Sequence, residues 1–268
     1  MTSDPRPVLI ACSHGTDDAE GRRVVRGIVD GIIAARPGLD VREAFVDVQE
    51  PALPTVVDAL PAGRRAVIVP LLLSAGFHTG VDIVEATRLR PGDVVAATPL
   101  GPDCRLSAIV TERMRGAGVR AGDAVVLAAA GSSRPEAAAA VTTVANGVRA
   151  RWPGRLAVGY GAGAQPRVPA AVSALREKPA TASSRVVIAS YLLAPGYFHD
   201  RLHEAGAELV TAPLGPDPRL ALIALDRYDA AVETAGGAFR PSAHARSSTE
   251  VDRQTSSLLD QRVGIQSA

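Results

Sequence analysis

Short apolar runs rich in β-branched residues alternate along the chain with segments of helical periodicity. Residues 7–12 read as a buried strand, and residues 17–35 read as an amphipathic helix with Val24, Ile28 and Ile32 on one face. The same alternation predicts the remaining elements of the first half: strands at 41–48, 66–72 and 93–97, and helices at 52–60, 81–89 and 103–114. Strands that alternate with helices indicate βαβ units, hence a parallel sheet covered on both faces.

This order of elements returns in the second half. The predicted strands lie at 124–129, 155–160, 185–190 and 207–210, and the predicted helices at 135–150, 169–175, 200–205 and 217–232. The letters repeat as well, because seven of eight positions agree between 99–106 and 213–220. We therefore predict an α/β fold of two tandem domains related by internal duplication, each with a parallel sheet of about four strands flanked by helices.

The predicted boundaries are 1–118 for the first domain and 119–235 for the second. The repeated Pro-Leu-Gly-Pro-Asp supports duplication but indicates no chemistry, since Gly and Pro make a turn and the Asp caps the next helix. Residues 236–268 are polar and Ser/Arg-rich and lack a sustained period, so we expect a disordered tail that contains His244, with at most a weak turn at 258–263.

Composition narrows the class of protein. The formal net charge of +1 gives no global field that would indicate a nucleic-acid or membrane partner. The two cysteines, Cys12 and Cys104, suggest no disulfide framework and favour a reducing compartment, the cytoplasm. The N-terminus lacks the apolar core of a signal peptide, and the apolar run 66–75 is far shorter than the ~20 residues needed to span a bilayer.

Two of the five histidines follow predicted strands. His14 follows the first strand and His78 the third, on predicted loops, and ligands of open α/β sheets bind beyond the carboxyl ends of strands. The neighbouring Gly15 and Gly76 would let the backbone approach a ligand. Asp47 ends the second strand, so two imidazoles and a carboxylate could hold a divalent first-row metal ion.

Each of these residues also has a structural interpretation. A single histidine after a strand is more often an ordinary loop residue, and Asp47 alone reads best as a satisfied carboxylate. His199 and His203 have the i, i+4 spacing of a helical metal site, but the second repeat has Gly131-Ser132-Ser133 where the first has His14-Gly15-Thr16. The role of these two histidines stays open, and the second repeat reads as catalytically degenerate.

Other motifs argue against competing activities. The glycines of 159–163 have the wrong spacing for a dinucleotide site, and Ser132 and Ser133 are not in a nucleophile elbow. A phosphate-ester hydrolase that uses His14 as nucleophile would need an arginine immediately before it, where Ser13 stands.

Three segments together resemble the sirohydrochlorin chelatases, the small class II chelatases. They are VLIACSHGT at 8–16, FVDVQEP at 45–51 and PLLLSAGFHTGVDI at 70–83. The resemblance extends over about residues 7–235 and implies a bilobal α/β chelatase with a tetrapyrrole in the interdomain cleft. The family's two metal-handling histidines fall on His14 and His78. Its acidic residue, commonly Glu, falls on Asp47, and its Asp after the second histidine falls on Asp82, interpreted as a helix cap or orienting residue.

The resemblance implies insertion of a divalent metal, Fe²⁺ first and Co²⁺ next, into sirohydrochlorin. His14 and His78 would receive the metal and accept protons, and imidazole titrates near pH 6.5, so activity should fall below about pH 6. We expect Ser13, Gly15, Ser74 and Gly76 to contact the substrate, and Arg22, Arg88 or Arg134 to pair with its carboxylates.

No organic cofactor is expected, because metal–nitrogen bonding supplies the driving force. The fused repeats favour a monomer. The alternative is a metal or tetrapyrrole carrier that uses the same pocket without catalysis.

Overall fold

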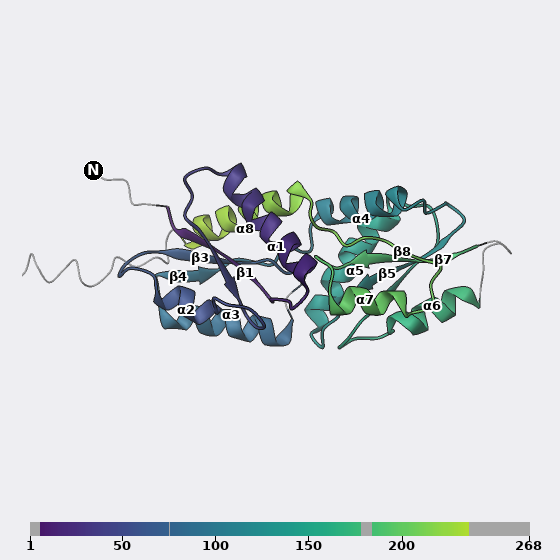
Figure 1. The fold of residues 1–268 in the computed structure, drawn as a ribbon, viewed down its shortest axis with the longest axis horizontal. Helices are drawn as coiled ribbons and strands as arrows, with labels where there is room; N and C mark the ends of the chain where they lie inside the picture. Colours follow the sequence, from purple (N-terminus) through teal and green to yellow (C-terminus); the bar gives the residue numbers. More distant parts are fainter. Residues whose placement is uncertain (1–5, 75, 178–183, 236–268) are drawn as a thin grey trace, which may run out of the picture.

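The chain forms two four-stranded parallel sheets that follow one another along the long axis of the molecule (Figure 1). The structure is a computed structural model, and it describes residues 6–74, 76–177 and 184–235, without the side chains of residues 77–79. The strand orders are β2-β1-β3-β4 and β6-β5-β7-β8, so each repeat has the same topology. The predicted fold class and duplication are confirmed for this part of the chain.

The first repeat contains eight elements. They are β1 (Val8–Ser13), α1 (Ala19–Ala35), β2 (Val41–Phe45), α2 (Leu53–Asp58), β3 (Ala66–Pro70), α3 (Phe77–Leu89), β4 (Val94–Ala96) and α4 (Cys104–Gly116). The second repeat has β5 (Ala124–Ala129), α5 (Pro135–Arg149), β6 (Leu156–Tyr160), α6 (Val168–Arg176), β7 (Val186–Tyr191), α7 (Tyr197–His203), β8 (Leu209–Val210) and α8 (Pro218–Ala235). The predicted order of strands and helices is confirmed throughout.

The central strands are apolar at nearly every position because both faces of each sheet are covered. In β1, Leu9 and Ala11 face one core, whereas Val8, Ile10 and Cys12 face another, as the period of two in a strand requires. The core on the side of α2 and α3 belongs to the first repeat alone, and the second repeat has its counterpart on the side of α6 and α7. The core on the opposite faces is continuous through both repeats.

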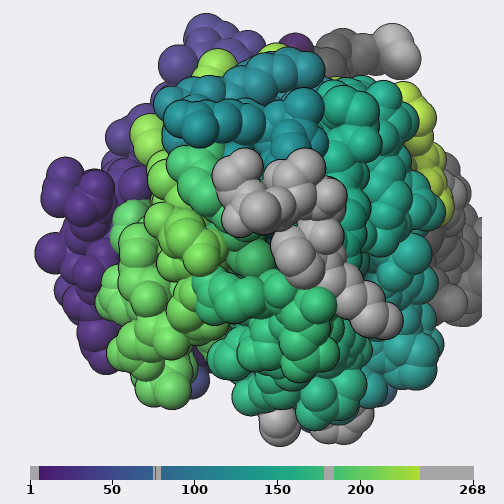
Figure 2. Space-filling model, turned by 90° about the vertical axis from the view of Figure 1, so that its right-hand side faces the viewer, coloured from purple at the N-terminus to yellow at the C-terminus, as the bar shows by residue number. Residues whose placement is uncertain are grey.

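That continuous core exists because the repeats exchange their last helices. The helix α8 ends the second repeat but packs on α1 and β3 of the first, and α4 ends the first repeat but packs on α5 and β7 of the second. Figure 2 shows α4, in blue-teal, against the green residues of the second repeat. The Tyr228 hydroxyl of α8 donates a 2.6 Å hydrogen bond to the Pro7 carbonyl. The predicted boundary at 118/119 falls between α4 and β5 along the sequence, whereas the packed units share their helices.

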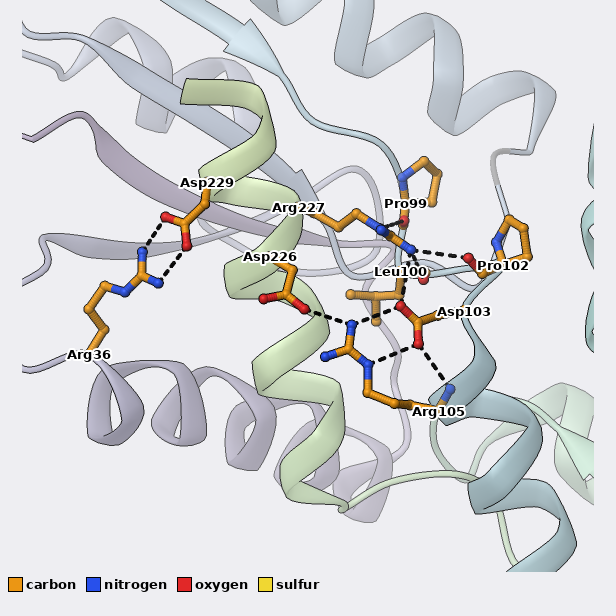
Figure 3. A network of polar contacts seen from close by, with 9 residues as sticks. All are labelled: Arg36, Pro99, Leu100, Pro102, Asp103, Arg105, Asp226, Arg227 and Asp229. Atoms are coloured by element: carbon orange, nitrogen blue, oxygen red, sulfur yellow. Dashed lines mark hydrogen bonds and ion pairs between the residues drawn. The ribbon is translucent and has the colours of Figure 1, made fainter. Parts of the chain in front are cut away.

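Polar contacts hold each exchanged helix on a turn of the other repeat, and Figure 3 shows those of α8. Arg227 of α8 donates to the carbonyl oxygens of Pro99, Leu100 and Pro102 at 3.0–3.1 Å. Arg113 of α4 repeats this arrangement with the second copy of the turn, donating to the carbonyls of Pro213, Leu214 and Pro216 at 2.9–3.1 Å. The repeated Pro-Leu-Gly-Pro-Asp motif thus makes the turn that accepts these arginines.

The helix caps of this motif are as expected. The Asp103 carboxylate accepts the Arg105 backbone N–H at 2.9 Å, and Asp217 does the same for Arg219 at 3.0 Å. Figure 3 also shows Arg105 bridging Asp103 to Asp226 of α8. The hydrogen bonds from Arg105 hold the pKa of Asp103 below its usual range.

Arg113→Ala or Arg227→Ala should each lower the free energy of unfolding by about 2 kcal/mol, because three backbone carbonyls lose a charged donor. Urea denaturation of the full chain measures this as a lower midpoint. Arg26→Ala is the control: its side chain is 58% exposed and pairs with Asp30 and Glu43. Its loss should cost less than about 1 kcal/mol. Equal midpoints for all three variants would contradict the role of the exchanged arginines.

Several predicted boundaries differ from the structure by a few residues, and three of them lie beside the residues proposed for a site. The second strand ends at Phe45, before a bend that contains Val48 at φ +63°. The third ends at Pro70, although the Leu71 N–H still donates to the Cys12 carbonyl of β1 at 2.7 Å. The helix predicted at 81–89 begins at Phe77 with Gly76 in the cap position, so His78 lies in its first turn and not on a loop. Asp82 accordingly lies inside α3, and its interpretation as a cap was wrong.

Candidate functional site

A cavity of about 850 Å³ lies between the two repeats, at the carboxyl ends of their central strands. Its walls come from the segments that follow β1 and β3 in the first repeat and β5 and β7 in the second. Loops after parallel strands meet at one edge of a sheet, and here two such edges share one hollow. The lining is mainly apolar and backbone, as is usual for a small-molecule site.

His14 lies on this cavity wall, exposed, directly after β1. Its carbonyl oxygen accepts the Asp47 N–H at 3.0 Å, and the Thr16 N–H donates to the Gln49 side-chain oxygen at 2.9 Å. Gly15, at φ +94°, lies against the Asp47 carbonyl so closely that a Cβ would overlap it. The loop that carries His14 is therefore held on the loop after β2, which leaves the imidazole on a fixed backbone.

Asp47 is brought beside His14 by its backbone, not by its carboxylate. Its Oδ1 accepts the Val48 N–H at 2.8 Å, and the residue is exposed and absent from the described lining, where Val48 stands. Metal ligation by Asp47 stays a prediction. Within the described residues, no three side chains of His, Cys, Asp or Glu gather into a ready metal site.

Ser74 and Gly76 line the cavity from the segment between β3 and α3, immediately before His78. The backbone of His78 lies in the first turn of α3, and its side chain is outside the described part. Ser13 and Gly15 line the cavity from the first loop. All four residues expected to contact a substrate thus lie on one cavity wall, and their contact with a ligand stays a prediction.

Ser13 also presents an unpartnered polar atom. The residue is 3% exposed, and its hydroxyl oxygen has no hydrogen-bond partner within the described structure. Buried hydroxyls are nearly always satisfied, so an orphan in a cavity wall is suited to a bound ligand or water.

The arginines proposed for substrate carboxylates lie outside the described cavity lining. Arg22 donates to the Thr16 carbonyl at 2.8 Å, which holds its guanidinium next to a lining residue. The Arg134 guanidinium, from the second repeat, lies within 4 Å of the position that a Cβ atom on Gly80 would occupy. Arg134 therefore reaches α3 of the first repeat. Arg88 lies in the last turn of α3, the end away from the cavity.

The second-repeat wall contains residues that sequence reasoning left without a role. Tyr197 and Phe198 at the start of α7 line the cavity with 70% and 40% of their surface exposed, their rings 5.5 Å apart edge to face. His199 lines it beside them. The sequence signal for this wall was a pair of adjacent aromatic residues in a chain with only 3% aromatic residues.

Cys12 precedes this site but faces the core. Burial, followed by the nearby charge of Asp82, raises the pKa of its thiol to about 12. A thiol reagent at pH 8 should therefore label the exposed Cys104 in the folded protein and reach Cys12 only after unfolding. Counting labelled thiols by mass spectrometry measures this, and rapid native labelling of both would contradict the buried environment of Cys12.

Comparison with known proteins agrees with this architecture. The profile of the CbiX family matches residues 8–117 and 124–231. The sirohydrochlorin cobaltochelatase of Methanothermobacter thermautotrophicus is 24% identical over an alignment of 135 residues, which covers 42% of this chain and 94% of that protein.

Solved structures share the fold. SirB from Bacillus subtilis, solved with Fe³⁺, has a TM-score of 0.70 at 20% identity, over 87% of this chain and 98% of that one. CbiX, described as the terminal enzyme of sirohaem biosynthesis in denitrifying bacteria, has a TM-score of 0.61 at 19% identity, over 84% and 99%.

No helix in the described part is long and apolar enough to cross a membrane. The family profile covers both repeats and most of the chain, with the cavity segments inside its matched ranges. The chain therefore belongs to the CbiX family, in agreement with the resemblance to sirohydrochlorin chelatases in its sequence.

Proposed function

We propose that this chain is a chelatase that inserts a divalent metal ion into sirohydrochlorin. The observation that carries the proposal is His14 on a fixed loop in the wall of a cavity of about 850 Å³. The volume of the cavity lies in the upper part of the ~300–1,000 Å³ range of small-molecule sites. A cavity in this part of the range suits a large ligand such as a tetrapyrrole.

The reaction exchanges two inner N–H protons of the macrocycle for one metal ion. His14 is the proposed acceptor of a proton and a transient metal ligand, since neutral imidazole has a lone pair for either task. His78, in the turn that follows Ser74 and Gly76, is the proposed second group. Asp47 is the proposed third, acting on the metal directly or by orienting an imidazole.

The remaining walls support binding of the macrocycle. The exposed faces of Tyr197 and Phe198 offer an aromatic surface for a planar π-system. The unpartnered Ser13 hydroxyl and the backbone around Gly15 and Gly76 can bind polar edges of the ring. Arg22 and Arg134 lie next to lining segments, where they can pair with the peripheral carboxylates.

Multiple turnover tests catalysis against the carrier alternative. The chain at low concentration is mixed with an excess of sirohydrochlorin and Co²⁺ under anaerobic conditions, and the absorption spectrum is followed. An enzyme converts many equivalents of tetrapyrrole per chain. Conversion that stops at one equivalent, or does not exceed the protein-free rate, would contradict the proposal.

Iron is the metal we propose as preferred, with cobalt next. Both are borderline divalent ions that accept imidazole, and the structures similar in fold include SirB with Fe³⁺ and SirB with cobalt. Competition between equal concentrations of Fe²⁺ and Co²⁺ tests the order. An excess of the cobalt product would overturn the iron preference and leave the chelatase proposal intact.

A further inference from the structure

The second-repeat wall of the cavity holds a histidine pair that the proposed mechanism does not use. His199 and His203 lie one turn apart on α7, with ring centroids 5.2 Å apart and ring planes at 86°. His199 lines the cavity, and His203 is exposed on the same helix.

The tautomer of His199 follows from its hydrogen bond. Its Nε2 lies 3.2 Å from the Thr211 carbonyl oxygen, which can only accept, so Nε2 carries the hydrogen and Nδ1 carries the lone pair. The carbonyl is fixed, because the Thr211 N–H donates to the Ile188 carbonyl of β7 at 2.9 Å and Thr211 is 1% exposed. Histidines that bind metals commonly donate their other N–H to a backbone carbonyl in this way.

The spacing of the two rings also fits one shared ion. With metal–nitrogen bonds of ~2.1 Å and tetrahedral angles, two imidazole centroids lie about 5 Å apart. An i, i+4 pair on a helix places both rings on one face. Two uncoordinated rings in edge-to-face contact lie at a similar distance, and titration with a metal ion distinguishes the two arrangements.

We propose that His199 and His203 form a second binding site for a divalent first-row metal ion, in the second-repeat wall of the cavity that also contains His14. The described residues supply no third His, Cys, Asp or Glu, so water completes the coordination and the ion stays exchangeable. Of the acidic residues near the pair, Glu204, directly after α7, pairs with Arg201 at 3.7 Å, and Asp200 of α7 is exposed.

This site gives the second repeat a metal function although Ala130, and not a histidine, stands at the position of His14 in the second repeat. An ion held here borders the same cavity as His14, which suits loading of the metal before insertion. The loading role rests on the proposed function, whereas binding of the ion does not.

Titration of the full chain with Co²⁺ alone, without tetrapyrrole, tests the binding. Calorimetry and the visible absorption of Co²⁺ give stoichiometry and affinity for the native chain, His203→Ala, His14→Ala and the control Asp200→Asn. His203→Ala should lose one equivalent or bind it at least ~10-fold more weakly, because one of two imidazole ligands is gone. His14→Ala and Asp200→Asn should keep this equivalent.

Identical titrations of the native chain and His203→Ala would overturn the proposal, as would loss of all binding in His14→Ala. Nitrogen NMR of the histidine rings gives a second readout: Co²⁺ should broaden the His199 and His203 signals in His14→Ala. Failure of the native chain to insert metal, with Co²⁺ binding still dependent on His203, would reject the proposed function and keep this site.

Discussion

His14→Ala should lower the rate of metal insertion into sirohydrochlorin by ~100-fold or more, the usual effect of removing a proton acceptor. The fold should persist, because the His14 side chain is exposed and the contacts that hold its loop are made by the backbone and by Gln49. Steady-state insertion followed by absorbance measures the rate, and thermal denaturation verifies that the melting temperature is unchanged within about 2 °C.

The matched control for His14→Ala is Arg23→Ala. Arg23 is an exposed residue of α1 outside the described cavity lining, so its loss should leave the rate unaltered. A His14→Ala variant with near-native turnover would remove this histidine from the mechanism. That result would also mean that no histidine of the first repeat in the described cavity lining takes part in catalysis.

Gly15→Ala and its counterpart Gly131→Ala should each destabilise the fold by about 3 kcal/mol or more. Both glycines have positive φ, +94° and +90°, which costs other residues ~1–2 kcal/mol. In addition, a Cβ would overlap the carbonyl of Asp47 in one repeat and of Ala162 in the other, which forces the backbone to shift. The melting temperature should fall on the order of 10 °C for a chain of this size.

Gly118→Ala separates the two causes. Gly118 has φ +73°, and a Cβ at this position would meet nothing within 4 Å, so the substitution should incur only the conformational cost. Below the melting transition, Gly15→Ala should also lower metal insertion through displacement of His14, whereas Gly131→Ala should retain more activity. Equal melting temperatures for Gly15→Ala and Gly118→Ala would show that the loop after β2 moves aside at no cost.

The order and type of the strands and helices were predictable because parallel strands buried on both faces are continuously apolar. The strand Ala124–Ala129 was predicted at the bounds that the structure gives. The exchange of α4 and α8 was not predictable, because helical periodicity identifies an apolar face but not the sheet that covers it. The early start of α3 was missed because Gly76 to Gly80 includes poor helix formers.

The rule that ligands bind beyond the carboxyl ends of strands led to Ser13, His14, Gly15, Ser74 and Gly76, and the structure has all five in the lining of one cavity, while their roles stay predictions. The direction of the Asp47 carboxylate was not predictable. The Asp47 carboxylate is directed by its hydrogen bond from the Val48 N–H. Val48 has a φ of +63°, a backbone angle that β-branched residues rarely adopt. The histidine pair of the second-repeat wall had no predicted role, because the second repeat has no histidine at the position of His14.

Cutting the polypeptide between residues 118 and 119 would produce fragments that are each incomplete. The first fragment would contain α4 without its partners α5 and β7, and its β3 would lack the cover of α8. The second fragment would contain α8 without α1 and β3, and its β7 would lack the cover of α4. Neither fragment should be stable alone, but a mixture of the two should reassemble by mutual complementation. In the intact polypeptide the two halves are joined, so each meets the other at an effective concentration of roughly millimolar. The separate fragments would have to find each other in dilute solution.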